Sequence, residues 1–421
     1  MNSKGIIFYL GLLCFPISFL AFINILYSLY FDHFINVNSY TLTLLTSSLI
    51  GFLFYFFGRK FQKRLNFFDQ VVLLIVSYFV MSLLISIAYY SSNYNISFIN
   101  AVFESFSGIT LTGFSIFNNI KYLDPTLIIW RSSSQWIGGL YFLIFLTLLF
   151  SNKTFNFKMT NLTFPGDSNF NSTENIKNHL LKLFIFYTSL SFIFLLLLSI
   201  ADVRLFNSVN LGMTLISGGG FLPTDNLSNI ISTNSQKIVL MLMFFLSITN
   251  FYLIFNFFNR RVLLKSHKED MYLFALIMIL TLLILFNDLD ILNLIISILS
   301  ALANSGLTLI TSDNNLGLYF LFITIVGGSL VSNTSGIKLA RLYILLKITS
   351  SEIIKLISPN SVINRTIFNS DSKINDENIK ISFLIFISFF LSLFILSSLL
   401  VIDDIGFERS FKLSILTLTN T

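Results

Sequence analysis

One arrangement occurs three times along this chain: a long apolar segment, a short amphipathic segment, a polar break that contains glycine, and another long apolar segment. The three breaks are residues 110–115, 216–221 and 302–307. Irregular backbone at membrane depth is stable only where it is buried in protein or lines a wet cavity. Breaks repeated around one axis would form a ring of backbone carbonyls, as in a cation filter. The repeat therefore predicts an ion pathway.

The composition predicts the class of protein. Hydrophobic residues make up 55% of the 421 residues and charged residues only 11%, with a mean hydropathy of +0.81. Soluble globular chains carry about 25% charged residues. Apolar runs long enough to cross a hydrocarbon core of about 30 Å recur along the whole length. We therefore predict an all-α polytopic membrane protein, with no sizeable soluble domain between its spans.

Nine segments are expected to span the bilayer, at about 6–30, 39–58, 69–90, 126–150, 179–200, 236–258, 271–287, 316–350 and 380–402. Four shorter segments are too brief to cross, at about 97–108, 205–215, 291–304 and 407–418. A short helix that enters from one side and a loop that returns fit these segments better than a full span. The first apolar run is longer than a signal peptide and lacks a clear cleavage site. It is therefore expected to be a permanent span.

Basic residues set the expected orientation. If the short segments enter from one face, every basic cluster falls on the opposite face, and the positive-inside rule makes that face cytoplasmic. The N-terminus is then cytoplasmic. The clusters are Lys4; Arg59, Lys60, Lys63 and Arg64; Lys153, Lys158 and Lys177; Arg260, Arg261, Lys265 and Lys268; and Lys355, Arg365, Lys373 and Lys380.

Residues of the kinds that carry catalysis do not cluster. The single cysteine, Cys14, lies in an apolar segment, and the three histidines fall in separate loops or at helix ends. The sequence contains no HExxH, GxSxG or P-loop pattern. We predict that the chain is not an enzyme, has no covalently bound cofactor and has no nucleic-acid partner.

The repeats predict a pseudo-fourfold arrangement in which helix, pore helix and helix recur around a central pore. The expected divisions are a two-helix extension over 1–65, pore repeats over 66–160, 161–268 and 269–357, and an incomplete fourth repeat over 358–421. The fourth repeat reaches residues 416–421 without a glycine. We therefore expect the natural reading frame to continue with a glycine and one more apolar span of roughly 20 residues.

Four motifs carry a resemblance to a known family. Residues 102–113 resemble the first pore segment of the TrkH/KtrB superfamily of potassium transporters, and residues 130–139 resemble the start of the helix that follows it. Residues 217–221 resemble the second filter, and residues 327–338 resemble the intramembrane loop of the third repeat. The resemblance covers essentially the whole chain. The extra pair of N-terminal spans is like TrkH rather than KtrB.

The resemblance implies one filter glycine in each repeat and a potassium-selective path between the repeats. Potassium is then the substrate, bound at Gly113, Gly219 and Gly306. Gly218 stands where threonine is usual, and the third filter contains Asn304 instead of a threonine-rich run. Both departures could loosen selectivity. The implied filter residues are Thr112, Gly113, Ser217, Gly218, Gly219, Asn304, Ser305 and Gly306.

In the family, the loop at 327–338 lies beneath the filter and gates it. Its glycines lend flexibility, and its hydroxyl and amide groups can satisfy freed backbone groups. Lys338 could place a positive charge in the cation path, or it could extend to the cytoplasmic interface with Arg341 and Lys347. The implied gating residues are Gly327, Gly328, Ser332, Asn333, Thr334, Ser335, Gly336 and Lys338.

Glu104 and Arg131 are rare charges near membrane depth, and such charges usually pair internally or mark function. We expect both to support the filter. Two alternatives remain open: Glu104 could act as an early-turn anion on its short helix, and Arg131 could lie at the outer interface.

The predicted function is potassium uptake across the cytoplasmic (inner) membrane. The family implies a homodimer and a cytoplasmic nucleotide-binding regulatory subunit, bound by the basic loops. One alternative is a sodium-permeable transporter of the same family. Another is a secondary transporter of a small organic solute, which would require substrate-shaped polar residues inside spans, whereas the breaks here carry small residues.

Overall fold

The computed structural model of this chain describes residues 3–61, 65–150, 173–251, 253, 268–284, 290–309, 316–359, 365–368 and 374–421. Throughout these residues the regular structure is helical, and they contain no β-strand. The described residues form two compact units. The first contains residues 3–150 and 173–236, and the second contains those from 237 onward. The predicted all-α membrane fold is confirmed.

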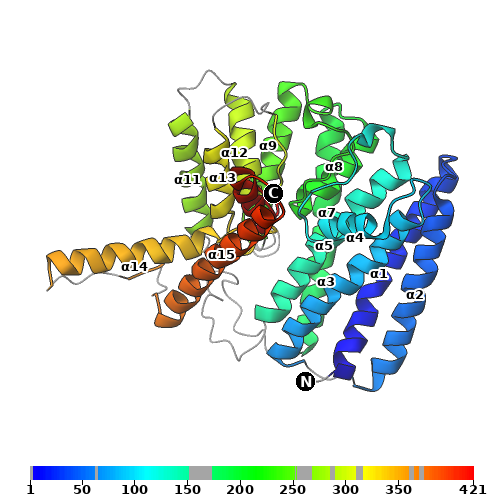
Figure 1. Ribbon diagram of the computed structural model, residues 1–421, viewed down its shortest axis with the longest axis horizontal. Coiled ribbons are helices and arrows are strands. Elements are labelled where there is room, and N and C mark those ends of the chain that lie inside the picture. The colour runs from blue at the N-terminus through cyan, green and yellow to red at the C-terminus, as the bar shows by residue number, and fades with distance from the viewer. Residues whose placement is uncertain are drawn as a thin grey trace. The chain divides into compact units, whose positions relative to one another are not determined.

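The first unit is built on long helices joined by short ones (Figure 1). Helices α1 and α2 pack along each other as a hairpin, and α5 packs against both short helices, α4 and α8. The helices are α1 (Ser3–Tyr30), α2 (Val37–Gly58), α3 (Phe67–Tyr90), α4 (Phe98–Ile109), α5 (Pro125–Phe150), α7 (Thr173–Ile200) and α8 (Leu205–Ser217), with 3-10 turns η1 (Arg59–Phe61), η2 (Ile120–Tyr122) and η3 (Leu227–Asn229).

The second unit repeats the pattern, but the predicted span 316–350 forms two helices, α13 and α14, that run in different directions (Figure 1). Helix α13 ends before residues 327–338, and α14 continues after them. The helices are α9 (Asn234–Ile248), which begins at the unit boundary, α11 (Lys268–Ile284), α12 (Ile291–Ala303), α13 (Gly317–Val326), α14 (Leu339–Ile357), α15 (Asp376–Ile402) and α16 (Phe407–Thr419).

Six helical segments in the described residues are long and apolar enough to cross a membrane. They are α1, α2 with η1, α3, α5, the apolar part of α7 and α15. Large apolar side chains such as Phe56 on α2 and Phe394 on α15 are exposed, which suits helices whose outer face contacts lipid. The four predicted short helices are α4, α8, α12 and α16.

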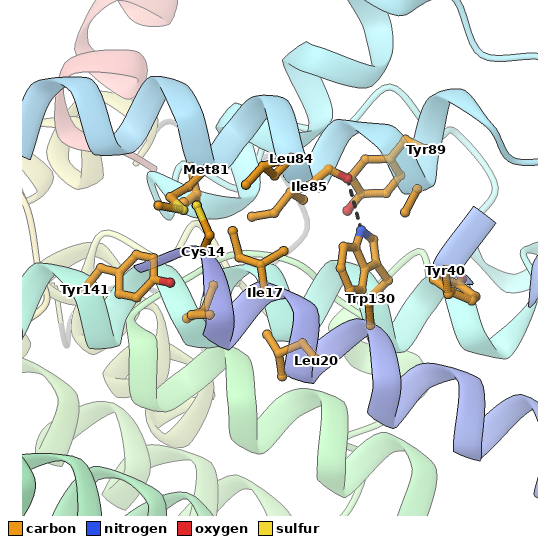
Figure 2. Packing of buried hydrophobic residues seen from close by; sticks show 14 of the residues in the cluster. Cys14, Ile17, Leu20, Tyr40, Met81, Leu84, Ile85, Tyr89, Trp130 and Tyr141 are labelled. Atoms are coloured by element: carbon orange, nitrogen blue, oxygen red, sulfur yellow. Dashed lines mark hydrogen bonds between the residues drawn. The ribbon is translucent and has the colours of Figure 1, made fainter. Parts of the chain in front are cut away.

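The core of the first unit fixes α5 in place (Figure 2). Cys14 and Ile17 of α1 pack with Met81 and Ile85 of α3 and with Trp130 of α5. Buried tryptophan and tyrosine need partners for their polar atoms. Trp130 Nε1 donates to the Ile85 carbonyl at 3.3 Å, and the Tyr141 hydroxyl donates to the Leu13 carbonyl at 2.5 Å. Helix α5 is thereby held by both α3 and α1.

One expected span is interrupted in the described residues, where Phe251 and Leu253 are again helical after α9 has ended. The apolar run at 236–258 predicts a continuous helix, but α9 ends at Ile248. The helix ends there because the next backbone donors bond elsewhere: Asn250 N–H donates to the Asp270 carboxylate at 3.0 Å, and Phe251 N–H to the Val331 carbonyl at 2.8 Å.

Several predicted features lie outside the described residues. They include the end of the run 236–258 from residue 254 on and the last three residues of the run 271–287. The boundaries of the five divisions stay predictions. The basic residues outside the described part are Lys63, Arg64, Lys153, Lys158, Arg260, Arg261, Lys265 and Lys373, and nothing is described of the side chain of Lys177.

Candidate functional site

All four short helices end in the same hydrogen-bonded turn. At each end one residue has positive φ, and its N–H donates to the carbonyl three residues before it. The N–H of the next residue donates to the carbonyl five residues before itself. This pair of bonds is the Schellman motif, which satisfies carbonyls that a helix end leaves open. The positive-φ residues are Leu111 (φ 68°), Gly218 (76°), Asn304 (58°) and Asn420 (54°).

This shared turn aligns the four breaks. Two residues after the positive-φ residue, the first three breaks have Gly113, Gly220 and Gly306. The intervening residues are Thr112, Gly219, Ser305 and Thr421. The sequence-based alignment paired Gly219 with Gly113. The hydrogen bonds instead pair the next residue, Gly220, with Gly113.

Two side-chain hydrogen bonds support the same alignment. The Ser107 hydroxyl donates to the Phe114 carbonyl at 2.5 Å, and the Thr214 hydroxyl donates to the Phe221 carbonyl at 2.9 Å. Each hydroxyl lies four residues before the positive-φ residue. Each carbonyl belongs to the residue that follows Gly113 or Gly220. The segment after Gly220 is therefore held as the segment after Gly113 is held.

The breaks lie in contact within each unit. A Cβ on Gly113, where φ is 82°, would lie only 2.9 Å from the Gly220 Cα. In the second unit a Cβ on Gly306, where φ is 66°, would lie 3.3 Å from the Thr421 carbonyl carbon. Asn304 Nδ2 also donates to the Thr421 hydroxyl at 3.3 Å. Glycine is required at Gly113 because both the backbone conformation and the approach of its neighbour exclude a side chain.

Helix α5 supports both breaks of the first unit through small residues. A Cβ on Gly138 would overlap the Ile109 carbonyl at the end of α4. A Cβ on Gly139 would lie 2.8 Å from the Ser217 Cβ at the end of α8. Small residues let membrane helices approach closely. The end of each short helix therefore rests directly on α5.

Glu104 and Arg131 form a buried ion pair next to these breaks. Arg131 Nε donates to Glu104 Oε1 at 2.8 Å, and the side chains are 1% and 0% exposed. Glu104 also accepts from the Ser115 hydroxyl at 3.0 Å and from Ile116 N–H at 2.9 Å. The internal pairing of these rare charges is confirmed. The Arg131 side chain is enclosed by protein and is not exposed to solvent.

Arg131 also reaches the second break. Its guanidinium donates to the Leu222 carbonyl at 3.3 Å and lies 4.2 Å from the centre of the Phe221 ring. A guanidinium over an aromatic face is held by a cation–π interaction. One side chain therefore braces the backbone that follows both breaks of the first unit.

The loop at 327–338 is ordered and folds back on the end of α13. Ile337 N–H donates to the Ile325 carbonyl at 2.9 Å, and Gly328 N–H donates to the Thr334 hydroxyl at 3.1 Å. Gly327 and Gly336 both have positive φ. As expected for irregular backbone inside a span, hydroxyl groups of the loop satisfy its freed backbone groups.

Lys338 is enclosed by its own loop. Its ammonium donates to the Ser332 carbonyl and hydroxyl at 3.3 and 3.1 Å, to the Thr334 hydroxyl at 2.7 Å, and to the Thr334 carbonyl. The residue is only 6% exposed. Lys338 therefore does not extend to an interface in this structure. A position in the cation path stays a prediction.

Two carboxylates that the sequence analysis did not single out anchor this loop. Glu269 Oε1 accepts from Leu330 N–H at 2.9 Å, and Asp270 Oδ1 accepts from Asn250 N–H at 3.0 Å. Both residues are buried in the first turn of α11. Ser329 N–H also donates to the Ile248 carbonyl at 3.0 Å. The loop is thereby bonded to the start of α11 and to the end of α9.

The third and fourth breaks contact the divided span. Asn304 Nδ2 donates to the Thr324 carbonyl of α13 at 2.8 Å. Asn420 Nδ2 donates to the Ser335 hydroxyl of the loop at 2.8 Å. The ends of α12 and α16 are therefore hydrogen-bonded to the two sides of the interruption.

The arrangement suits a cation. Each short helix ends at its break, so its negative dipole end faces the irregular backbone. Gly113 and Gly220 are half-buried and Gly306 is exposed, whereas Ser217, Asn304 and Ser305 beside them are buried. In the described residues no three His, Cys, Asp or Glu side chains come together as a metal site would require. The oxygen atoms at the breaks are those of the backbone, of the hydroxyl groups and of the Asn304 amide, whose Oδ1 has no hydrogen-bond partner among the described residues.

Comparison with known proteins finds similarity to members of the family that the motifs resemble. An uncharacterized cation transporter of Methanocaldococcus jannaschii is 25% identical over 366 residues, which cover 84% of this chain and 75% of the relative. The Trk system potassium uptake protein TrkH of Escherichia coli is 22% identical over 347 residues, covering 77% of this chain and 71% of the relative. No family model matches the chain.

A solved structure gives the fold. The crystal structure of the potassium transporter TrkH from Vibrio parahaemolyticus superposes with a TM-score of 0.87 at 21% identity, covering all of this chain and 90% of that one. The resemblance to the TrkH/KtrB superfamily that the motifs predict is confirmed, and the chain is a TrkH-like polytopic membrane protein.

Proposed function

We propose that this chain is the membrane subunit of a potassium uptake system. Potassium sheds water and binds carbonyl oxygens of the aligned breaks, at Gly113, Gly220 and Gly306 and at the residues just before them. Rings of backbone carbonyls replace the hydration shell of potassium in selective filters. The relatives named as Trk potassium uptake proteins support this substrate. The ion crosses the membrane along the path through this filter, and transport involves no covalent step.

The observation that carries the proposal is the shared helix end. Four short helices stop with the same two backbone bonds, and the three glycines that follow are in register. If each glycine only kinked a buried helix, the four helix ends would not need the same two backbone bonds or the same glycine position. The same geometry at four places supports four equivalent contributions to one ligand.

The loop at 327–338 acts as the gate in this proposal. It interrupts a span with small polar residues and holds the Lys338 ammonium inside the protein. Its bonds to α9, α11 and Asn420 give it a defined position from which it can be displaced. Removing those bonds is then expected to raise ion flux.

The proposal extends to the assembly. Two copies of the chain form a homodimer in the inner membrane, with the N-terminus in the cytoplasm. A nucleotide-binding regulatory subunit binds the basic cytoplasmic loops. The support is the resemblance to the family together with the distribution of basic residues along the sequence.

Rubidium uptake tests the function. The full chain is produced in cells that lack potassium uptake, and Gly113→Ser is compared with Gly317→Ser, a glycine with no atom within 4 Å of a Cβ. Gly113→Ser should abolish uptake, and Gly317→Ser should leave it unchanged. Equal uptake by both variants would overturn the filter. Sodium uptake as fast as rubidium uptake would instead favour the sodium-permeable alternative, and uptake of neither ion would favour an organic solute.

A further inference from the structure

The second break lacks a hydroxyl side chain that the other three breaks share. Between the positive-φ residue and the aligned glycine, the other breaks carry a hydroxyl side chain, from Thr112, Ser305 or Thr421. The second break carries Gly219 there. Its φ is not positive, so backbone conformation does not explain the glycine. Another part of the structure must account for it.

Gln135 of α5 occupies the space of the missing side chain. A Cβ on Gly219 would overlap both the Cδ and the Oε1 of the Gln135 side chain, and would lie 2.8 Å from its Nε2. Gln135 is fully buried. It lies one helical turn after Arg131 and one turn before Gly139, which also face the second break. The buried amide has no room to move toward solvent. Position 219 therefore has no space for a side chain while Gln135 is present.

Gln135 also bonds to the filter backbone. Its Oε1 accepts from Phe221 N–H at 3.1 Å. That N–H belongs to the peptide group whose carbonyl is that of Gly220. A trans peptide is planar, and its N–H and C=O point in opposite directions. Because the described residues contain no cis peptide, holding the N–H toward α5 turns the Gly220 carbonyl away from α5.

The other polar end of Phe221 is also fixed. Its carbonyl accepts from the Thr214 hydroxyl at 2.9 Å, so the residue after the aligned glycine is held at both its N–H and its C=O. Gln135 Nε2 has no hydrogen-bond partner among the described residues. The Gln135 amide is therefore held by the hydrogen bond that its Oε1 accepts and by packing, and not by further hydrogen bonds from its Nε2.

We infer that Gln135 is a positioning residue for ion selectivity: it orients the Gly220 carbonyl, and Gly219 is glycine because the Gln135 amide takes the place of a hydroxyl side chain. The inference rests on the proposed function of the breaks as a cation filter. The first pore repeat thus shapes the filter segment of the second.

Two variants of Gln135 separate its bond from its bulk. Gln135→Met keeps the bulk and removes the acceptor, so Phe221 N–H loses its partner. Gln135→Ala removes both. In the full chain, the sodium concentration that halves rubidium uptake should fall in both variants by roughly tenfold, the scale of one buried hydrogen bond left unmade.

A rescue tests the packing of the pair. Gly219→Ser alone should lower rubidium uptake by roughly tenfold or more, because the new Cβ meets the Gln135 amide. Adding Gln135→Ala should restore most of the uptake, and adding Gln135→Met should not. Directly contacting residues show coupling of this kind in double-mutant cycles.

A buried glutamine elsewhere in the first unit serves as the control. Gln236 is 6% exposed and accepts from Ser232 N–H at 2.8 Å. Gln236→Met should lower the thermal midpoint without changing the ratio of sodium to rubidium uptake. A general loss of packing would move both variants alike, so a selectivity change confined to Gln135 separates positioning from stability.

The outcomes distinguish this inference from the proposed function. Failure of the unmodified chain to take up rubidium would overturn the function itself. Uptake by the unmodified chain with unaltered selectivity in Gln135→Met would overturn only the role of Gln135. Equal rescue of Gly219→Ser by alanine and methionine would overturn the steric pairing. If the serine variants do not reach the membrane, the Gln135→Met result decides alone.

Discussion

The two units hold their breaks by different means. In the first unit, both breaks rest on one continuous helix, α5, and a fully buried ion pair braces the backbone beyond them. In the second unit, the equivalent breaks contact a span that is itself divided, and side-chain amides of Asn304 and Asn420 make the contacts. A continuous helix and a buried charge pair resist movement. A divided helix with polar contacts can be rearranged.

The contrast suggests that the first unit binds the ion selectively and that the second unit gates its path. Groups that bind an ion selectively must be held in position, whereas a gate needs an element with two arrangements. The first unit has the features of a rigid support. The second unit contains the loop at 327–338, whose anchors are a few hydrogen bonds to α9 and α11. Mutations should therefore reduce flux in the first unit and raise it in the second.

The largest expected effect comes from breaking the ion pair of the first unit. Arg131→Met leaves Glu104 buried without its cation, and removing one partner of a buried pair costs about 3–5 kcal/mol. We expect a large fall in thermal midpoint and the loss of rubidium uptake, measured on purified protein and in cells.

The second unit supplies the control for that experiment. Lys237 and Asp290 form an ion pair of 3.1 Å in which the aspartate side chain is 54% exposed. Asp290→Asn should cost no more than about 1 kcal/mol, because exposed pairs contribute little. Equal destabilisation by the two variants would show that the first unit is not specially braced.

A smaller effect of opposite sign is expected at the loop. Glu269→Leu removes the acceptor for Leu330 N–H and should free one side of the loop. A buried N–H left without its acceptor costs about 1–3 kcal/mol, so flux should rise by roughly tenfold.

Glu269→Gln keeps an acceptor oxygen and should raise rubidium flux much less than Glu269→Leu. The reading of the second unit as the movable one fails if Glu269→Leu lowers flux while the protein remains folded. A rise in flux of equal size for both variants would assign the effect to the loss of the carboxyl group and not to the hydrogen bond with Leu330.

The smallest effect should come from the positive-φ asparagine at the third break. Asn304→Gly removes the bond to the Thr324 carbonyl but suits the left-handed backbone, in which glycine is favoured. The two terms offset, so the change in unfolding free energy should stay within about 1 kcal/mol, as for one neutral hydrogen bond. A drop of many degrees in thermal midpoint would mean that the second unit is held as rigidly as the first.

Much of the fold could be predicted because its signals are local. Apolar runs mark the spans, and short amphipathic runs that end at glycine mark α4, α8 and α12. The pairing of Glu104 with Arg131, which are 27 residues apart, could be expected from the rarity of charges at that depth.

The remaining features depend on distant partners. Glu269 bonds to Leu330, 61 residues away, and a carboxylate at the start of a helix gives no sign of this. Helix α9 ends where Asn250 N–H bonds to Asp270 and Phe251 N–H bonds to Val331, both distant in sequence. Ser247, Thr249 and Asn250 are polar residues near the middle of this apolar run.

The alignment of the second break was missed by one residue for a local reason. Gly218, Gly219 and Gly220 are consecutive, so no side chain within the run distinguishes one register from another. The usable signal was the hydroxyl four residues before each positive-φ residue, at Ser107 and Thr214. It becomes readable only once the hydrogen bonds of the helix ends are known.

The most direct test of the aligned breaks is a structure with a bound ion. Crystals of the full chain grown in rubidium should show an anomalous peak within coordinating distance of the carbonyl oxygens of Gly113, Gly220 and Gly306. A peak that contacts the Gly219 carbonyl but not the Gly220 carbonyl would contradict the alignment. The absence of any peak near the three glycines, with rubidium bound elsewhere in the protein, would contradict the filter itself.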